Sequence, residues 1–513
     1  MRRGFEEALG MADITAGLRQ PGRSTTAEEH QNIPKVAWGP ILLVAGAVGT
    51  ALLIASRDYG YFFDEAYFVV AGRDHLSWGY FDQPPLVPAL AALMDRIAPG
   101  SLLVLRLPAT LAAVGGMIGT ALIAREFGGG RGAQPLAAFA YACSICVTLA
   151  HWLATYSMDP ACWVLLIWLI VRWTRLNAEG RANDRLLLYA GLITAVSLQI
   201  KFLVPALWVA LFSTALVFGP RRMLGRPALW LGAAVATAAT VPNLIWQQHN
   251  NWPYTHMSEV VAAEFPGLGR FLWDSAVGAG LAVGLPLVAV GLPALFLVPR
   301  WRPYRFVAAA LILVFLGYLV MHGRSYYVCG LYAAPLAAGA VIVTGLCRRV
   351  SIRAVVATAV AAGTILFVAA IPIYPRSVAE RLPDTDVIMT ARGFVRSDTM
   401  VGDFSDIVVA AYDSLPPEMK PHIAIVAESY PFAAIVDLYR GKTGLPRAYS
   451  PHRGYYYFGT PPETATAILY LGTPTPTLTA AFTSSETVTP DLATLLVGRK
   501  TPWTTLWPQL RAQ

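Results

Sequence analysis

The stretch YGYFFDEAYFVVAGRDHLSWGYFDQPPLVPALAALM, residues 59–94, decides the class of this chain. It lies between two apolar segments, 36–55 and 102–124, and each is long enough to cross a bilayer, which takes about 20 residues. Between these segments lie many aromatic residues and also the acids Asp58, Asp64, Glu65, Asp74 and Asp82. Aromatic rings gather at headgroup level in membrane proteins, and acids near a bilayer usually face a cavity. We therefore expect a folded, functional outer loop over residues 57–102, with Asp64 at its centre.

Composition places the chain among membrane proteins. Of its 513 residues, 56% are hydrophobic and only 14% are charged, and the mean hydropathy is +0.51. A soluble protein of this length needs far more charge to cover its surface. The hydrophobic pattern therefore predicts a polytopic α-helical membrane protein with about eleven spans. The expected spans lie near residues 36–56, 103–124, 134–153, 160–175, 186–200, 202–218, 227–247, 274–298, 304–322, 327–346 and 354–374.

Basic residues predict the orientation of these spans. On one side of the membrane every short loop is basic, whereas the loops on the other side hold few arginines and lysines. The basic loops cover residues 125–131, 172–185, 221–226, 300–305 and 348–353. Because cytoplasmic loops carry such an excess, we expect a cytoplasmic N-terminus and an extracytoplasmic C-terminal segment. The net charge of +8 follows from this topology and does not indicate a nucleic-acid partner.

The chain divides into three expected parts. Residues 1–35 are polar and are expected to form a disordered cytoplasmic tail, and residues 36–374 are expected to form the transmembrane domain. From about residue 375 the hydropathy falls, which predicts a small extracytoplasmic α/β domain over residues 375–513. Its expected elements are short buried strands at 386–390, 422–427 and 467–471 and an amphipathic helix at 432–439.

Three ionisable residues stand at the outer ends of apolar segments. Asp159 precedes Pro160, Lys201 interrupts an apolar run, and Arg324 opens a span together with two tyrosines. Each has a plain alternative. Asp–Pro is a common helix start with Asp as N-cap, a lysine at this depth can snorkel to the surface, and an arginine beside tyrosines can anchor a helix at the interface.

Taken together, these residues favour a site. The topology places Asp159, Lys201 and Arg324 on the same membrane face as Asp64 and Asp82, and ionisable groups at membrane depth usually mark function. Acids and cations on one face suit an amphipathic, anionic substrate such as a lipid phosphate. The cations would hold the phosphate while the tail stays in the bilayer, which leaves the carboxylates free for acid–base chemistry.

Two residue sets raise the question of a metal. His256, Glu259 and Glu264 lie in a second aromatic-rich outer loop, and for them we favour a re-entrant or interfacial helix that lines the cavity over a metal site. Cys143 and Cys146 lie on an apolar segment with no His or Asp partner nearby, which favours simple packing over a redox or metal site.

Several motifs in this order resemble a known family. The run D-E-A-Y at residues 64–67 is followed by W-G-Y-F-D-Q-P-P at 78–85, then by Y-S-M-D-P at 156–160, a lysine at 201 and R-S-Y-Y at 324–327. The series resembles the polyprenyl-phosphate-dependent glycosyltransferases of the GT-C fold, that is, the protein mannosyltransferase-like and aminoarabinose-transferase-like enzymes of family 39 and its relatives. The segments AESYPFAAIVDLY and HRGYYYFG in the tail look like the outer domain of bacterial members.

The resemblance implies roles for the acids. Residues 36–374 would form a GT-C catalytic domain in which Asp64 is the catalytic base. Glu65 would either orient Asp64 or point away from it. Asp159 would be a second acid that lines the same cavity, and a divalent cation could bind between Asp64 and Asp159, although nothing in the sequence demands one.

It also implies substrate-binding residues. Asp82 falls where the aminoarabinose-transferase-like enzymes have the Glu of an E-K-P-P motif, and Gln83 replaces its phosphate-binding Lys. Part of the phosphate clamp must then come from elsewhere, or the donor headgroup differs. The remaining expected contacts to the substrate are Lys201, Arg324, Tyr326 and Tyr327.

The implied function is an inverting glycosyltransferase at the outer face of the cytoplasmic membrane, surrounded by membrane lipids. Its donor would be a polyprenyl-phosphate sugar, and its acceptor a hydroxyl of an envelope glycan, lipid or protein. A transporter or flippase of a lipid-linked substrate is the main alternative, but it should show paired, similar halves with broken helices at mid-membrane. A non-catalytic lipid-binding scaffold is the third.

Overall fold

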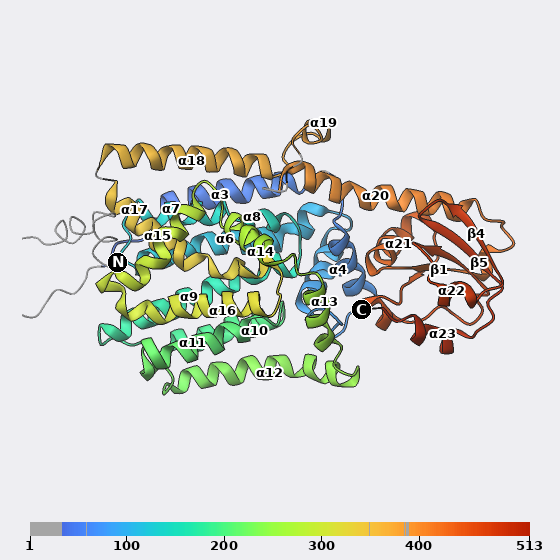
Figure 1. Ribbon diagram of the computed structural model, residues 1–513, viewed down its shortest axis with the longest axis horizontal. Helices are drawn as coiled ribbons and strands as arrows, with labels where there is room; N and C mark the ends of the chain where they lie inside the picture. Colours follow the sequence, from blue (N-terminus) through green and yellow to red (C-terminus); the bar gives the residue numbers. More distant parts are fainter. Residues whose placement is uncertain (1–32, 58, 348, 384, 386–388, 513) are drawn as a thin grey trace, which may run out of the picture.

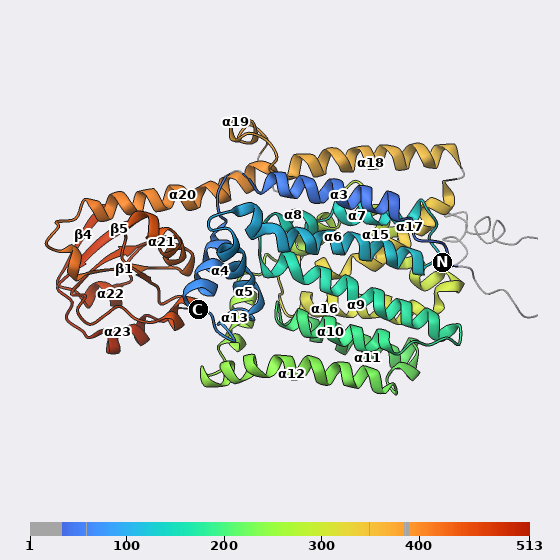
Figure 2. The same ribbon diagram turned by 180° about the vertical axis from the view of Figure 1, so that it is seen from behind.

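A long helical bundle and a smaller α/β domain at one of its ends make up the structure (Figure 1, Figure 2). The computed structural model describes residues 33–57, 59–347, 349–383, 385 and 389–512. Nearly all of the expected N-terminal tail, and Asp58, lie outside the described residues. The expectation of a polytopic helical membrane protein with a small C-terminal α/β domain is confirmed.

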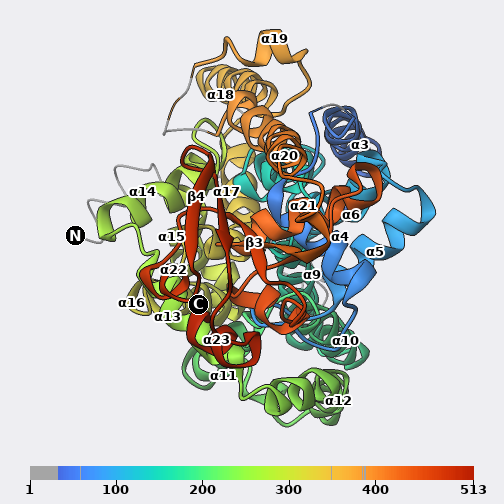
Figure 3. The ribbon, with the colours of Figure 1, turned by 90° about the vertical axis from the view of Figure 1, so that its right-hand side faces the viewer.

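Within the described residues, six helical segments are long and apolar enough to cross a membrane. These are α3 (Trp38–Ala55), α6 (Leu102–Glu126), α9 (Thr155–Ala178), α12 (Pro227–His249), η4 with α16 (Pro299–Val320) and α18 (Val350–Ala370). Seen end-on, α18 and α12 lie on opposite edges of the bundle (Figure 3).

Two further segments of the bundle are bent. The first joins α7 (Ala133–Ala142) to α8 (Ile145–Thr148) and η1 (Leu149–His151) at 59°, and the second joins η5 (Ser325–Leu331) to α17 (Ala333–Leu346) at 56°. The three other expected spans contain shorter apolar helices: α10 (Arg185–Leu198), α11 (Val204–Phe218) and α15 (Gly284–Leu297).

The span expected at 274–298 is not one continuous helix. It is divided between α14 (Leu268–Gly278) and α15, and Gly280 between them has a φ of 98°. This left-handed conformation, which glycine adopts without strain, ends the first helix.

Short helices cover the end of the bundle that faces the α/β domain. They are α4 (Phe63–Asp74), α5 (Leu86–Ile97), η3 (Pro253–His256) and α13 (Met257–Ala263). The first two pack backbone to backbone, because a Cβ at Gly72 would lie 1.9 Å from the carbonyl oxygen of Pro88. Figure 1 shows α4 between the bundle and the α/β domain. The remaining short element, η2 (Arg221–Met223), follows α11.

The C-terminal domain is built on a sheet of five strands in the order β2-β1-β3-β5-β4. The strands are β1 (Ile423–Ala427), β2 (Ala448–Tyr449), β3 (Ala467–Leu471), β4 (Ser484–Thr489) and β5 (Ala493–Val497). β1 is parallel to both of its neighbours, whereas β5 is antiparallel to β3 and β4. The helical elements are α19 (Arg376–Ala379), α20 (Ala391–Asp413), η6 (Lys420–His422), α21 (Tyr430–Thr443), η7 (Arg453–Phe458), α22 (Pro476–Ala480) and α23 (Trp503–Leu510).

The local predictions for this domain are largely confirmed. The strands expected at 422–427 and 467–471 are β1 and β3, and the helix expected at 432–439 lies within α21. Of the strand expected at 386–390, residues 386–388 lie outside the described part of the chain, and residues 389 and 390 form no strand.

Candidate active site

Helix α4 directs two neighbouring acids into different surroundings. Asp64 and Glu65 lie in its first turn, where the helix dipole favours negative charge. Neighbouring residues on a helix point about 100° apart because a turn takes about 3.6 residues. Asp64 accordingly faces a cavity, whereas Glu65 is fully buried on the other side.

Both carboxylate oxygens of Glu65 accept hydrogen bonds from within the protein. Its Oε1 accepts hydrogen bonds from Nε of Arg106 (2.9 Å) and from the backbone N–H of Leu153 (2.9 Å). Its Oε2 accepts from Nη2 of Arg106 (2.8 Å) and from the N–H of Phe62 (3.0 Å). Of the two alternatives that the sequence left open, the geometry favours the one in which Glu65 points away.

The cavity in front of Asp64 has a volume of about 610 Å³, and we call it the charged cavity. Seven of the expected site residues line it, namely Asp64, Asp82, Gln83, Lys201, Arg324, Tyr326 and Tyr327. The buried amide Nε2 of Gln83 has no hydrogen-bond partner among the described residues and is therefore free to donate to a ligand. Residues from the outer loop, the middle of the chain and η5 thus meet in one place.

Tyrosine rings hold the lysine of this cavity. Nζ of Lys201 lies 4.2 Å from the ring centroid of Tyr327 and 5.0 Å from that of Tyr326, which are cation–π distances. Nη1 of Arg324 donates to the hydroxyl of Tyr326 (3.0 Å). Lys201 and Arg324 both line the cavity, so neither is a simple surface anchor.

Asp159 lies behind this cavity and not on its wall. Helix α9 begins at Thr155, so Asp159 lies inside the helix and the alternative in which it is the N-cap is wrong. Its Oδ1 accepts a hydrogen bond from Ser197 (2.7 Å), and it interacts electrostatically with Lys201. A cation between Asp64 and Asp159 remains a prediction. Within the described ranges, no group of three or more His, Cys, Asp or Glu side chains is placed to hold a metal ion.

The second outer loop contributes part of the wall of the charged cavity. Met257, Ser258 and Val261, on or beside α13, line the charged cavity, as the favoured interpretation expected. Glu264, which follows this helix, forms ion pairs with Arg324 and Arg453.

The sequence did not single out the contribution of the C-terminal domain. Tyr430 and Arg453 also line the charged cavity, and Tyr430 donates a hydrogen bond to Oδ1 of Asp64 (2.8 Å). Both lie in the tail segments AESYP and HRGYYYFG that resembled the outer domain of the family. Those motifs were the available signal, although they do not show which face of the domain turns to the membrane.

Comparison with known proteins identifies the architecture. The family model of dolichyl-phosphate-mannose-protein mannosyltransferases matches residues 82–246, about a third of the chain. The crystal structure of ArnT from Cupriavidus metallidurans bound to undecaprenyl phosphate is 15% identical with a TM-score of 0.57, and the match covers 89% of this chain and 97% of that one. This chain has the GT-C fold.

A second structure of this fold is also similar. The cryo-EM structure of the arabinofuranosyltransferase AftD from Mycobacteria is 15% identical with a TM-score of 0.52, and the match covers 93% of this chain but 41% of that one. No curated protein sequence matches the chain significantly. The resemblance to the GT-C glycosyltransferases is confirmed, and the protein is a multi-pass membrane protein.

Burial raises the pKa of two acids in this GT-C cavity. It raises the pKa of Asp64 to about 6, while the hydrogen bond from Tyr430 acts against this rise. It also raises the pKa of Asp82, whose Oδ1 accepts a hydrogen bond from the hydroxyl of Tyr67 (3.3 Å), and the nearby charge of Arg453 opposes that rise. A carboxylate with a pKa just below neutral pH is well matched to general-base catalysis.

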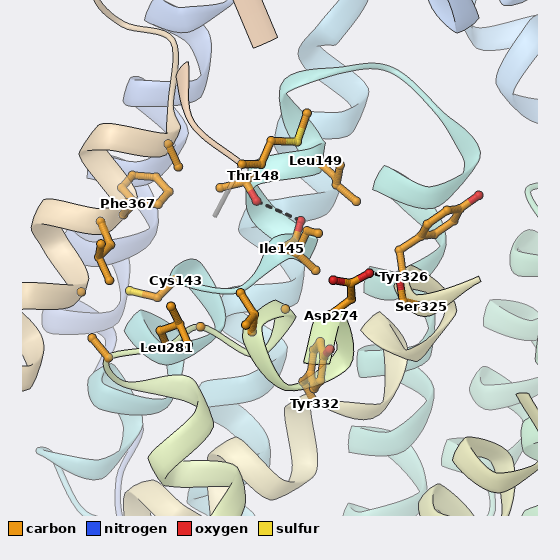
Figure 4. A pocket seen from close by; sticks show the side chains of 18 of the residues that line it. Cys143, Ile145, Thr148, Leu149, Asp274, Leu281, Ser325, Tyr326, Tyr332 and Phe367 are labelled. Carbon is orange, nitrogen blue, oxygen red and sulfur yellow. Dashed lines mark hydrogen bonds between the residues drawn. The ribbon is translucent and has the colours of Figure 1, made fainter. Parts of the chain in front are cut away.

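A second, mostly apolar cavity of about 350 Å³ is lined in part by Tyr326 (Figure 4). Leu149 and Phe367 are among the apolar side chains that line it. At its polar end the hydroxyl of Ser325 donates to Asp274 (3.5 Å). Tyr326 lines both this apolar cavity and the charged cavity.

Proposed function

We propose that this protein transfers a sugar from a polyprenyl-phosphate-linked donor to an acceptor hydroxyl, with inversion at the anomeric carbon. One observation carries the proposal: the acids Asp64 and Asp82 line the same cavity as Lys201, Arg324 and Arg453. Acids and cations in one cavity of a membrane protein suit a substrate that combines a lipid phosphate with a sugar. The fold supports the same function, because ArnT, which shares it, is bound to undecaprenyl phosphate.

Asp64 acts as the general base in this mechanism. The acceptor oxygen forms a bond to the anomeric carbon while the bond from that carbon to the phosphate oxygen breaks, and the electron pair leaves with the polyprenyl phosphate. The acceptor proton passes to Oδ2 of Asp64, because Oδ1 is already engaged with Tyr430. The nucleophile enters opposite the leaving group, so the configuration inverts.

The cations of the charged cavity interact with the leaving group. Lys201 and Arg324 stabilise the negative charge that develops on the departing phosphate. In the buried surroundings of the cavity such charge–charge interactions are stronger than in water. The donor sugar is a hexose or a pentose, and the acceptor is an envelope glycan, lipid or protein.

The reaction takes place at the outer face of the cytoplasmic membrane in this proposal. The basic loops, such as the one with Arg221 and Arg222, favour a cytoplasmic position for the opposite end of the bundle. Fusions of alkaline phosphatase and of green fluorescent protein to the C-terminus test this. An active phosphatase and a dark fluorescent protein are expected, and the reverse would contradict the orientation.

The chemistry is tested by Asp64→Asn and Asp64→Ala. Purified protein is given a panel of polyprenyl-phosphate sugars with envelope acceptors, and product is measured by mass spectrometry. Both variants are expected to lose at least about 100-fold in kcat, the lower end of what a positioned base contributes. Asp95→Asn is the matched control, because Asp95 lies on α5 and, among the described residues, accepts a hydrogen bond only from the N–H of Gly100.

The outcome separates this proposal from its rival. A transporter or flippase finds no support in the comparisons, and it would move lipid-linked sugar across vesicles without forming a glycosylated product. If the wild-type protein transfers no sugar from any donor in the panel, or if Asp64→Asn keeps full activity, the proposed chemistry is refuted.

A further inference from the structure

The carboxyl ends of the parallel strands β1 and β2 face the charged cavity, because Tyr430 and Arg453, which follow them, line it. β1 is parallel to β2 on one side and to β3 on the other, and the chain passes from β1 through α21 to β2 before it crosses to β3. The connections therefore diverge at the carboxyl end of β1, the kind of point where parallel sheets hold ligands. Tyr430 follows β1 here, and Arg453 follows β2.

The segments that follow β1 and β2 pack closely against α4. The rings of Tyr430 and Tyr67 meet edge to face with their centroids 4.9 Å apart. A Cβ at Gly454 would lie 2.0 Å from the hydroxyl of Tyr67, so only glycine allows the backbone of η7 to approach this far. The contact brings the hydroxyl of Tyr430 to 2.8 Å from Oδ1 of Asp64.

Tyr430 is itself fixed in place. Only 8% of it is exposed, and its backbone N–H donates to Nδ1 of His452 (3.2 Å). Its ring stacks on the imidazole of His452 at 5.5 Å, and the guanidinium of Arg453 lies 5.8 Å from its centroid. Among the described residues, no other side chain donates a hydrogen bond to Asp64. The orientation of that carboxylate thus depends on a rigid tyrosine from another domain.

We propose that Tyr430 is a positioning residue of the active site, which fixes the carboxylate of Asp64 so that its Oδ2 faces the reacting hydroxyl. The C-terminal domain is then a part of the catalytic centre and not only a cover for it. This inference rests on the proposed function, because it assigns Tyr430 to the base of that reaction.

The same hydrogen bond affects the pH at which Asp64 can act as a base. Burial raises the pKa of Asp64 to about 6, and the hydrogen bond from Tyr430 is the largest influence that lowers it. Without the phenol hydroxyl the pKa of Asp64 rises further, so a larger share of the base is protonated at neutral pH. Removing one hydrogen bond to a charged group shifts a pKa by about one unit.

The test is Tyr430→Phe in the full-length protein, with kcat and KM measured across pH. Phenylalanine keeps the ring and its contacts, so only the hydroxyl is removed. We expect the acid limb of the kcat profile to move up by about one pH unit, while KM for the donor stays unchanged. Tyr456→Phe is the matched control, since Tyr456 also lies on the C-terminal domain but stacks on Trp507. It should behave as the wild type.

A second readout does not need the donor. Protonated carboxyl groups react with a carbodiimide, so the labelling of Asp64, followed by mass spectrometry, reports its protonation against pH. Its midpoint should rise in Tyr430→Phe and not in Tyr456→Phe. If the wild-type protein transfers no sugar but the midpoint still shifts in Tyr430→Phe, the effect of Tyr430 on Asp64 is supported and only the proposed function is refuted. If Tyr430→Phe keeps wild-type activity, and neither its kcat profile nor the midpoint of its labelling shifts, only the role of Tyr430 is refuted.

Discussion

Replacing Arg106 by methionine should destabilise the protein strongly. The side chain of Arg106 is completely buried in α6, and its Nη2 donates to Glu65 (2.8 Å), to Oδ2 of Asp398 (3.1 Å) and to the carbonyl of Gly60 (2.9 Å). Its Nη1 lies 3.2 Å from Nε2 of His151. One guanidinium therefore joins α4, which carries the proposed base, to α6 and to α20 of the C-terminal domain.

The size of the effect follows from this burial. Removing one partner of a buried ion pair costs about 3–5 kcal/mol, because the other charge is left without compensation. In Arg106→Met both Glu65 and Asp398 lose their cation, so we expect a loss at the upper end of this range. Adding Glu65→Gln and Asp398→Asn removes the uncompensated charges and should restore about 1–3 kcal/mol.

Denaturant unfolding in detergent micelles measures these changes. The control is Arg376→Met, which breaks an exposed pair with Glu380 (2.8 Å). Such a pair contributes about 0–1 kcal/mol. The reasoning is wrong if Arg106→Met costs no more than Arg376→Met. It is also wrong if the triple variant is no more stable than Arg106→Met.

Three further changes test the charged cavity. Asp82→Asn removes a negative charge that raises the pKa of Asp64, so the acid limb of the kcat profile should move to lower pH. Gly454→Ala should lower both thermal stability and kcat, since its Cβ would overlap a tyrosine hydroxyl of α4. Gly441→Ala has open space inside α21, so it should leave kcat unchanged and should not lower thermal stability, because alanine favours a helix. Lys201→Met should raise KM for the donor at least about 10-fold, the effect of losing one charge-assisted hydrogen bond, and an unchanged KM would exclude Lys201 from phosphate binding.

The sequence predicted much of the charged cavity because topology is a strong constraint. The basic loops placed Asp64, Asp82, Lys201 and Arg324 on one membrane face, although they are far apart in the chain. A bilayer allows few ways to arrange such residues, since ionisable groups must avoid lipid and turn toward a common interior. The structure brings all four to one cavity.

The remaining features depend on tertiary contacts that no local pattern encodes. Asp159 was expected on the cavity wall or as a helix cap, but the helix begins earlier, where Ser157 accepts a hydrogen bond from the N–H of Ala154 (3.0 Å). The role of Tyr430 depends on which edge of the C-terminal sheet meets α4. That edge is determined by close packing between two domains, and hydrophobic periodicity does not report it.

The cations of the charged cavity are held in two different ways, and this difference bears on their roles. Arg324 and Arg453 both form ion pairs with Glu264, so part of their hydrogen-bonding capacity is already used. Lys201 lies against the rings of Tyr326 and Tyr327, and a ring attracts a cation without accepting its ammonium protons in strong hydrogen bonds. An incoming phosphate therefore finds an ammonium group at Lys201 that Glu264 does not engage, whereas at each arginine part of the guanidinium is already bound to Glu264, although Nε of Arg453 has no partner among the described residues. For this reason Lys201, rather than Arg453, is the cation whose loss should weaken donor binding most.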